Sequence, residues 1–151
     1  MKKYLVLLFC LAGLVLAACD NQAGKPYVKI VGGGFVFNYR YSTYIYGFVV
    51  KPLRPLPAGG VLEASFDLPD SDEKFVATLP VQEGKTQYLF ESKPLQGVKK
   101  DTPYKVRLRL VEEGSGKELA LLEKDYKTTV DQSTLPTKAP VKGIGYFPED
   151  K

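Results

Sequence analysis

The feature that most constrains this sequence is an alternation of apolar and polar residues with a period of two. It is clearest in the segments 61–68 and 104–110, where every second residue is apolar and the residues between are mostly charged or polar. Successive side chains of a β-strand point to opposite faces, so this pattern predicts strands with one buried and one solvated face. The chain is therefore expected to fold as β-structure.

Weaker runs extend this pattern over residues 27–130, with Gly, Pro, Asp and Ser clusters between them that are typical of turns. A last run at 118–129 follows Gly114-Ser115-Gly116, although residues 118–124 are rich in helix formers. The prediction is a single all-β domain at 27–130, an antiparallel β-sandwich of about seven strands. The expected strands are 27–31, 35–41, 44–50, 61–68, 74–81, 86–91 and 104–110, with 118–129 as a possible eighth.

Glycine and proline mark two irregular points within the expected domain. Gly32-Gly33-Gly34 precedes a strand, and no Gly-Lys-Ser or Gly-Lys-Thr follows, so a bend or bulge is expected there and not a phosphate-binding loop. Residues 52–60 contain three prolines and two glycines. This stretch is too rich in proline for a central strand and is expected to be a long connection.

The first 18 residues have the pattern of an export signal. Lys2 and Lys3 precede the apolar stretch 4–16, which has the length of a secretory signal. A membrane-spanning helix needs about 20 apolar residues, and this stretch runs directly into polar residues. We therefore expect residues 1–18 to be a signal peptide and residues 19–26 to be a short polar tether.

The end of this segment, Leu16-Ala17-Ala18-Cys19, resembles the lipobox of bacterial lipoproteins. The resemblance implies cleavage before Cys19, a diacylglyceryl group on its thiol and acylation of the new amino group. Two or three acyl chains anchor a protein stably. The expected location is the cell envelope, on a membrane and facing the periplasm or the exterior. In enteric-type bacteria, Asp after the lipidated cysteine favours the inner membrane, and Asp20 fits that rule, but inner or outer membrane stays undecided.

A second resemblance lies near the end of the expected domain. Leu95, Thr102, Tyr104 and Val106 are similar to the residues around the tyrosine corner of fibronectin type III and related immunoglobulin-like domains. The resemblance implies a sandwich in which the Tyr104 hydroxyl bonds back to the preceding loop. Two departures are the absence of tryptophan and of the immunoglobulin cysteine pair. The resemblance supports an architecture and carries no function.

Residues 131–151 are expected to form a flexible tail, because three prolines interrupt any regular element. The segment Ile144-Gly145-Tyr146-Phe147 is apolar within that tail. Docking of this segment on a sheet edge or on a partner is the alternative to a loose end.

Composition excludes several kinds of chemistry. The chain has no histidine, and Cys10 leaves with the signal, so histidine-based catalysis, histidine-ligated metals and an internal disulfide are not expected. Two of the 21 basic residues lie in the signal, which leaves an excess of two over the 17 acidic residues. Nucleic acid is therefore not an expected partner. The acidic loop with Asp67, Asp70, Asp72 and Glu73 lacks the EF-hand spacing and is expected to be a solvated turn, with no cofactor.

The most unusual local feature is the density of aromatic residues between 35 and 48. Phenylalanines in this run are expected to pack in the core. Tyrosine hydroxyls need partners when buried, and tyrosines around a turn are typical of recognition surfaces. The candidate contact residues are Tyr39, Tyr41, Tyr44 and Tyr46. Ring stacking on a sugar is an alternative use of the same residues.

The functional prediction is a lipid-anchored envelope protein that binds another envelope protein and is not an enzyme. One alternative is a structural accessory subunit of an envelope assembly or secretion complex. Another is a carbohydrate-binding module, in which case a glycan is the ligand.

Overall fold

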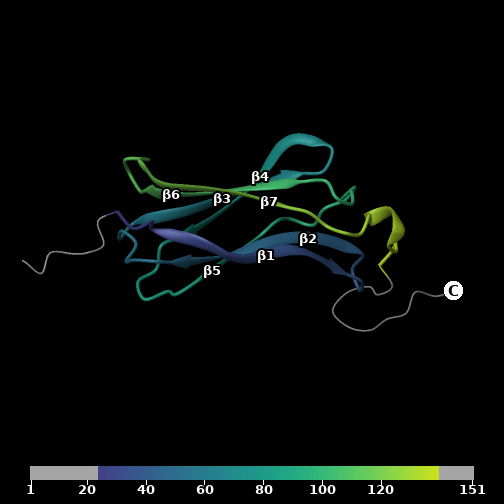
Figure 1. The fold of residues 1–151 in the computed structure, drawn as a ribbon, viewed down its shortest axis with the longest axis horizontal. Helices are drawn as coiled ribbons and strands as arrows, with labels where there is room; N and C mark the ends of the chain where they lie inside the picture. The colour runs from purple at the N-terminus through teal and green to yellow at the C-terminus, as the bar shows by residue number, and fades with distance from the viewer. Residues whose placement is uncertain (1–23, 140–151) are drawn as a thin grey trace, which may run out of the picture.

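The computed structural model describes residues 24–139, which form two packed antiparallel sheets (Figure 1). One sheet has the strand order β1-β2-β5 and the other β4-β3-β6-β7. The predicted all-β sandwich of about seven strands is confirmed. The strands are β1 (Val28–Asn38), β2 (Thr43–Pro52), β3 (Gly60–Leu68), β4 (Ser71–Pro80), β5 (Tyr88–Glu91), β6 (Tyr104–Glu112) and β7 (Glu118–Tyr126).

Two of the expected strands, 27–31 and 35–41, are parts of one strand, β1. With the possible eighth strand present as β7, the described strands number seven. The pairing of β1 with β2 shifts register between Ile30 and Gly32, which is the bulge that the three glycines predicted. Pairing continues through the bulge to Asn38. Residues 39–41 then form a turn and not the end of a strand. The run at 118–129 does form a strand, which ends at Tyr126.

The core lies between the sheets and is built from the inward residues of each strand. Rings from opposite sheets meet there: Tyr46 contacts Phe66 edge to face at 5.2 Å between centroids, and Phe48 contacts Phe66 at 5.6 Å. Both sheets contribute buried residues at every second position, as the sequence pattern requires. The largest fully buried side chains are Tyr46, Tyr88, Phe48, Phe66, Phe90, Leu62, Leu108 and Leu110.

The outward faces of the two sheets differ in chemistry. On the four-stranded sheet, Arg107 pairs with Glu123 at 2.6 Å, and Arg109 bridges Glu63 at 3.0 Å and Glu118 at 2.9 Å. On the three-stranded sheet, outward apolar residues around Gly34 and Gly47 line a shallow hollow. The outward apolar residues of this sheet are Val31, Val36, Ile45, Val49 and Leu89.

The domain has two distinct ends (Figure 1). At the end where the chain enters, the beginning of β1 pairs with the end of β2, and the loops 53–59 and 81–87 lie close together. We call this the entry end. At the opposite end, the turn 39–42 joins β1 to β2, and the yellow segment after β7 lies nearby in Figure 1. We call this the hairpin end.

The chain stays packed on the domain beyond residue 130, which was the expected boundary. Gln132–Thr134 form a short 3-10 helix. The Gln132 side chain accepts a hydrogen bond from the backbone N–H of Val98 at 3.0 Å, and Gln132 N–H donates to Val98 O at 3.0 Å. Leu135 packs against the core. These contacts attach the first part of the predicted tail to the hairpin end, while residues 140–151 lie outside the described residues.

Candidate functional site

The four candidate tyrosines do not form one patch. Tyr39 and Tyr41 lie in the turn at the hairpin end, with 60% and 45% of their surface exposed. Tyr44 and Tyr46 are 4% and 0% exposed. They occupy inward positions of β2, so the alternation that predicted an aromatic face turns that face into the core. The predicted contact patch is therefore corrected to its two turn residues.

Internal partners satisfy the hydroxyls of the two buried tyrosines. The Tyr44 hydroxyl lies 2.8 Å from Thr128 Oγ1, and the Tyr46 hydroxyl donates to Asp67 O at 2.7 Å. Burial raises the pKa of Tyr46 well above its ordinary value, with a smaller contribution from Asp67. Both rings therefore hold the sheets together and offer no atom to an external ligand.

The turn that carries the exposed tyrosines is held by local hydrogen bonds. Asn38 accepts twice, from Arg40 N–H at its Oδ1 (3.0 Å) and from Tyr41 N–H at its backbone O (3.3 Å). The Tyr39 ring packs edge to face on Phe37 at 4.9 Å between centroids. Ser42, which is buried and has a φ of 51°, donates to the backbone O of Pro136. We call the exposed residues Tyr39, Arg40 and Tyr41 the hairpin patch.

Tyr104 occupies the position that the tyrosine-corner resemblance assigns to it. It is 4% exposed at the start of β6, and its hydroxyl accepts a hydrogen bond from Lys99 N–H at 2.9 Å. The bond joins β6 to the loop that precedes it, as the resemblance implied. Tyr104 therefore has a structural role at the hairpin end.

The four acidic residues that were expected in one loop lie around the tight connection from β3 to β4: Asp67 is in β3, Asp70 is in the connection, and Asp72 and Glu73 are in β4. Asp67 pairs with Lys74 at 2.6 Å and accepts from Lys105 N–H at 3.0 Å, and Asp70 pairs with Lys99 at 2.6 Å. Among residues 24–139, no group of three Asp, Glu, Cys or His side chains lies close enough to hold a metal ion. Asp67 and Asp70 therefore act as partners of lysines.

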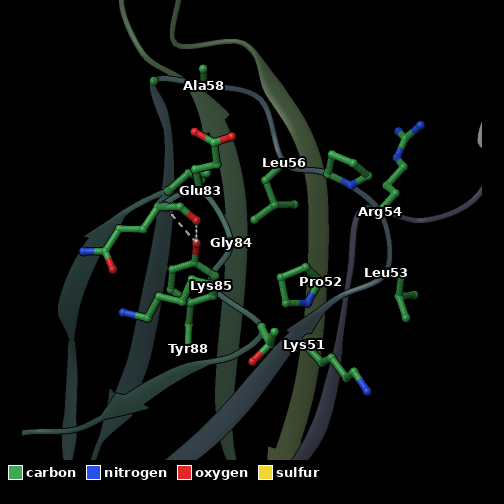
Figure 2. A pocket seen from close by; sticks show the side chains of 15 residues that line it. Lys51, Pro52, Leu53, Arg54, Leu56, Ala58, Glu83, Gly84, Lys85 and Tyr88 are labelled. Carbon is green, nitrogen blue, oxygen red and sulfur yellow. Dashed lines mark hydrogen bonds between the residues drawn. The ribbon is translucent and has the colours of Figure 1, made fainter.

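An open hollow lies at the entry end (Figure 2). The sequence did not predict it. The hollow has a volume of about 900 Å³ and lies between the loops 53–59 and 81–87. The Tyr88 hydroxyl closes the second loop, accepting from Gln82 N–H at 3.0 Å and donating to Gln82 O at 3.3 Å. The proline-rich connection was visible in the sequence, but nothing there showed that residues 81–87 would face it.

The entering chain is fixed to the same loop. Leu53 N–H donates to Tyr27 O at 2.9 Å, and the Arg54 guanidinium carbon lies 3.5 Å from the centroid of the Tyr27 ring. These contacts place the start of the domain beside the hollow. They leave the hairpin patch at the other end of the sandwich.

Two of the predicted features cannot be placed in the fold. Cys19, the predicted lipid attachment, and the apolar segment 144–147 lie outside the described residues. No helix within residues 24–139 combines the length and the apolar character needed to cross a membrane.

Comparison with known proteins finds no family model that matches the chain and no curated protein that matches it.

Proposed function

We propose that this chain is a lipid-anchored bacterial envelope protein whose sandwich binds another protein at its hairpin end and performs no catalysis. The observation that carries the proposal is the separation of the two ends. The chain enters the domain beside the loop 53–59, whereas the hairpin patch lies at the opposite end. An anchor at Cys19 would therefore leave Tyr39 and Tyr41 facing away from the membrane.

The chemistry of the hairpin patch suits protein recognition. Of the tyrosines and phenylalanines among the described residues, Tyr39 and Tyr41 alone are exposed. Tyrosine offers a large amphipathic contact with few rotatable bonds, and tyrosine and arginine are enriched among the residues that dominate binding energy. The hydrogen bonds from Arg40 and Tyr41 to Asn38 restrict the turn in advance, which lowers the entropy lost on binding.

The finer family assignment is part of the proposal. The two antiparallel sheets and the Tyr104 bond to the preceding loop support a sandwich of the fibronectin type III or immunoglobulin-like kind. Leu16-Ala17-Ala18-Cys19 supports the lipid anchor. The absence of histidine from the sequence supports a binding role over catalysis.

The binding role is tested by photo-crosslinking in the native envelope. A photoreactive residue replaces Tyr39 or Tyr41, and the matched control replaces Val76, which is 50% exposed on β4 of the other sheet. A discrete protein adduct from the turn positions, absent from the control, is expected. Adducts that are equally frequent at Val76 would contradict a specific surface at the hairpin end. Binding of a glycan in place of a protein, with loss on Tyr41→Ala, would favour the carbohydrate-binding alternative.

The anchor is tested separately with Cys19→Ser. The parent protein is expected to stay in the membrane fraction through a high-salt wash, because acyl chains insert into the bilayer independently of ionic strength. The variant is expected to be released by the same wash. Retention of the variant after the wash would refute lipid anchoring at Cys19.

A further inference from the structure

The cations at the entry end have an arrangement that the fold alone does not explain. Lys29 in β1 and Lys51 in β2 are direct partners in the antiparallel register, and both are exposed. Like charges directly opposite each other across a strand pair are destabilising. Within residues 24–139, neither lysine forms an ion pair with a carboxylate. An anionic surface near both lysines would offset this repulsion.

More positive charge lies beside this pair, around the hollow. Lys51, Arg54 and Lys85 line the hollow together with Glu83, and the Glu113 carboxylate stands at its edge beside Gly59. Figure 2 shows the three basic side chains reaching away from its centre, while Leu56 and Pro52 border it. Charges spread around a rim suit an extended anionic surface, whereas a small anion would need donors that converge on one point.

An apolar side chain stands among these cations. Leu53 is 37% exposed in the loop 53–59, directly between Lys51-Pro52 and Arg54. Pro52, Pro55 and Pro57 restrict this loop, so holding Leu53 at a surface loses little conformational entropy. Binding at a membrane interface combines burial of apolar area with attraction of basic side chains to anionic lipids, and Leu53 with its basic neighbours offers both.

We propose that the entry end docks on the anionic surface of a phospholipid bilayer, with Lys29, Lys51 and Lys85 at the headgroups and Leu53 in the interface. The position of the entering chain supports this occupant. Residues 19–25 span at most about 25 Å when extended, and the chain after them is fixed to loop 53–59 by the Leu53–Tyr27 hydrogen bond. The orientation rests on the proposed anchor, but docking itself does not require the acyl chains.

Vesicle co-sedimentation of the non-lipidated chain tests the proposal. The protein is residues 19–151 carrying Cys19→Ser, and the vesicles are phosphatidylcholine with or without one third phosphatidylglycerol. The expected result is partition onto the anionic vesicles only, weakening as salt is added because surface charges are screened. Lys29→Glu with Lys51→Glu is expected to lower the partition coefficient about tenfold or more. Adding Leu53→Ser to this double variant is expected to lower the partition coefficient further.

Matched controls separate a specific surface from net charge. Lys100→Glu with Lys127→Glu makes the same change of charge with residues of the hairpin end, and Val76→Ser removes an exposed apolar residue from the other sheet. Equal thermal midpoints establish that each variant is folded. Equal loss of binding by the two charge-reversed pairs, or equal binding to neutral vesicles, would overturn the proposal. So would a photoreactive residue at Leu53 that captures a protein and no lipid in the native envelope.

These outcomes are independent of the anchor. Loss of vesicle binding would leave release of the Cys19→Ser protein from native membranes unaffected. Failure of that release would in turn leave vesicle binding by the non-lipidated chain unaffected.

Discussion

At the residue scale, a glycine lets the edge strands of the two sheets pack closely. Gly33 has a φ of 152°, and a Cβ built there would collide with the Tyr126 hydroxyl and lie 2.5 Å from Gly47 O. Tyr126 in β7 donates to Gly32 O at 3.3 Å, which links the edge strands of the two sheets. The bulge in β1 therefore lets the backbone approach β7 closely enough to close one side of the sandwich.

The first prediction concerns this contact. Gly33→Ala is expected to lower the free energy of unfolding by about 2 kcal/mol or more, because the added methyl overlaps backbone and ring and the φ angle disfavours a side chain. Gly34→Ala is the matched control, because its Cβ would have no neighbour within 4 Å. Urea unfolding of both variants measures the difference. Equal stability of the two would contradict the close packing of Tyr126 on Gly33.

At the element scale, the four-stranded sheet carries a row of ion pairs across β3, β6 and β7. Arg107, followed by Lys105, lowers the pKa of Glu123, and hydrogen bonds from Arg109 to Glu118 and Glu63 raise the pKa of Arg109. These side chains are partly exposed, so each pair contributes modestly and is screened by salt. Two of the pairs, Arg107–Glu123 and Arg109–Glu63, join residues directly opposite each other in the register, where opposite charges favour the pairing.

The pH dependence of stability follows from Glu123. Its pKa is lower in the folded protein than in the unfolded chain, so its contribution is present above the ordinary glutamate pKa and is lost as the pH falls through the lowered value. Thermal unfolding measured between neutral pH and about pH 3 checks this. Glu123→Gln is expected to melt earlier near neutral pH and to converge with the parent at the acidic end.

The control for that series is Glu91→Gln in β5, because Glu91 forms no ion pair with another described residue. This variant is expected to follow the parent across the range. If the difference in thermal midpoint between Glu123→Gln and the parent were the same at every pH, the Arg107–Glu123 pair would make no pH-dependent contribution to folding.

At the scale of the whole molecule, the domain extends past its last strand. The segment after β7 returns to the hairpin end, where Gln132 binds Val98 and Leu135 joins the core. Hydrogen bonds from Ser133 N–H and Oγ to Asp131 lower the pKa of that carboxyl and hold the short helix. The segment thus covers the loop that also carries the Tyr104 hydrogen bond.

A pair of truncations tests this boundary. Residues 24–139 are expected to unfold cooperatively with the β-rich circular dichroism of the parent. Residues 24–130 are expected to be less stable by about 2 to 4 kcal/mol, because buried groups near Val98 lose their partners and Leu135 no longer covers the core. Urea unfolding compares the two fragments. Equal stability would place the boundary at residue 130 after all.

The sequence by itself determined the β-class, the approximate number of strands and the inward residues of β3 and β6, because alternation is a local property of each strand. The alternation in Leu62–Phe66 and in Tyr104–Leu110 predicted a strand without knowledge of the neighbouring strands. The bulge at Gly32-Gly33-Gly34 and the hydrogen bond of Tyr104 were also predictable, since each depends on a short local motif.

Only the tertiary structure decided which aromatic residues are available to a partner. Tyr44 and Tyr46 resemble Tyr39 and Tyr41 in sequence, but which face of β2 is covered depends on the opposite sheet and its Phe66. In the same way, the entry-end hollow exists because the loops 53–59 and 81–87, about 25 residues apart in the chain, meet at one end of the sandwich. Burial and cavities are properties of pairs of elements, and local periodicity contains no information about how such pairs pack.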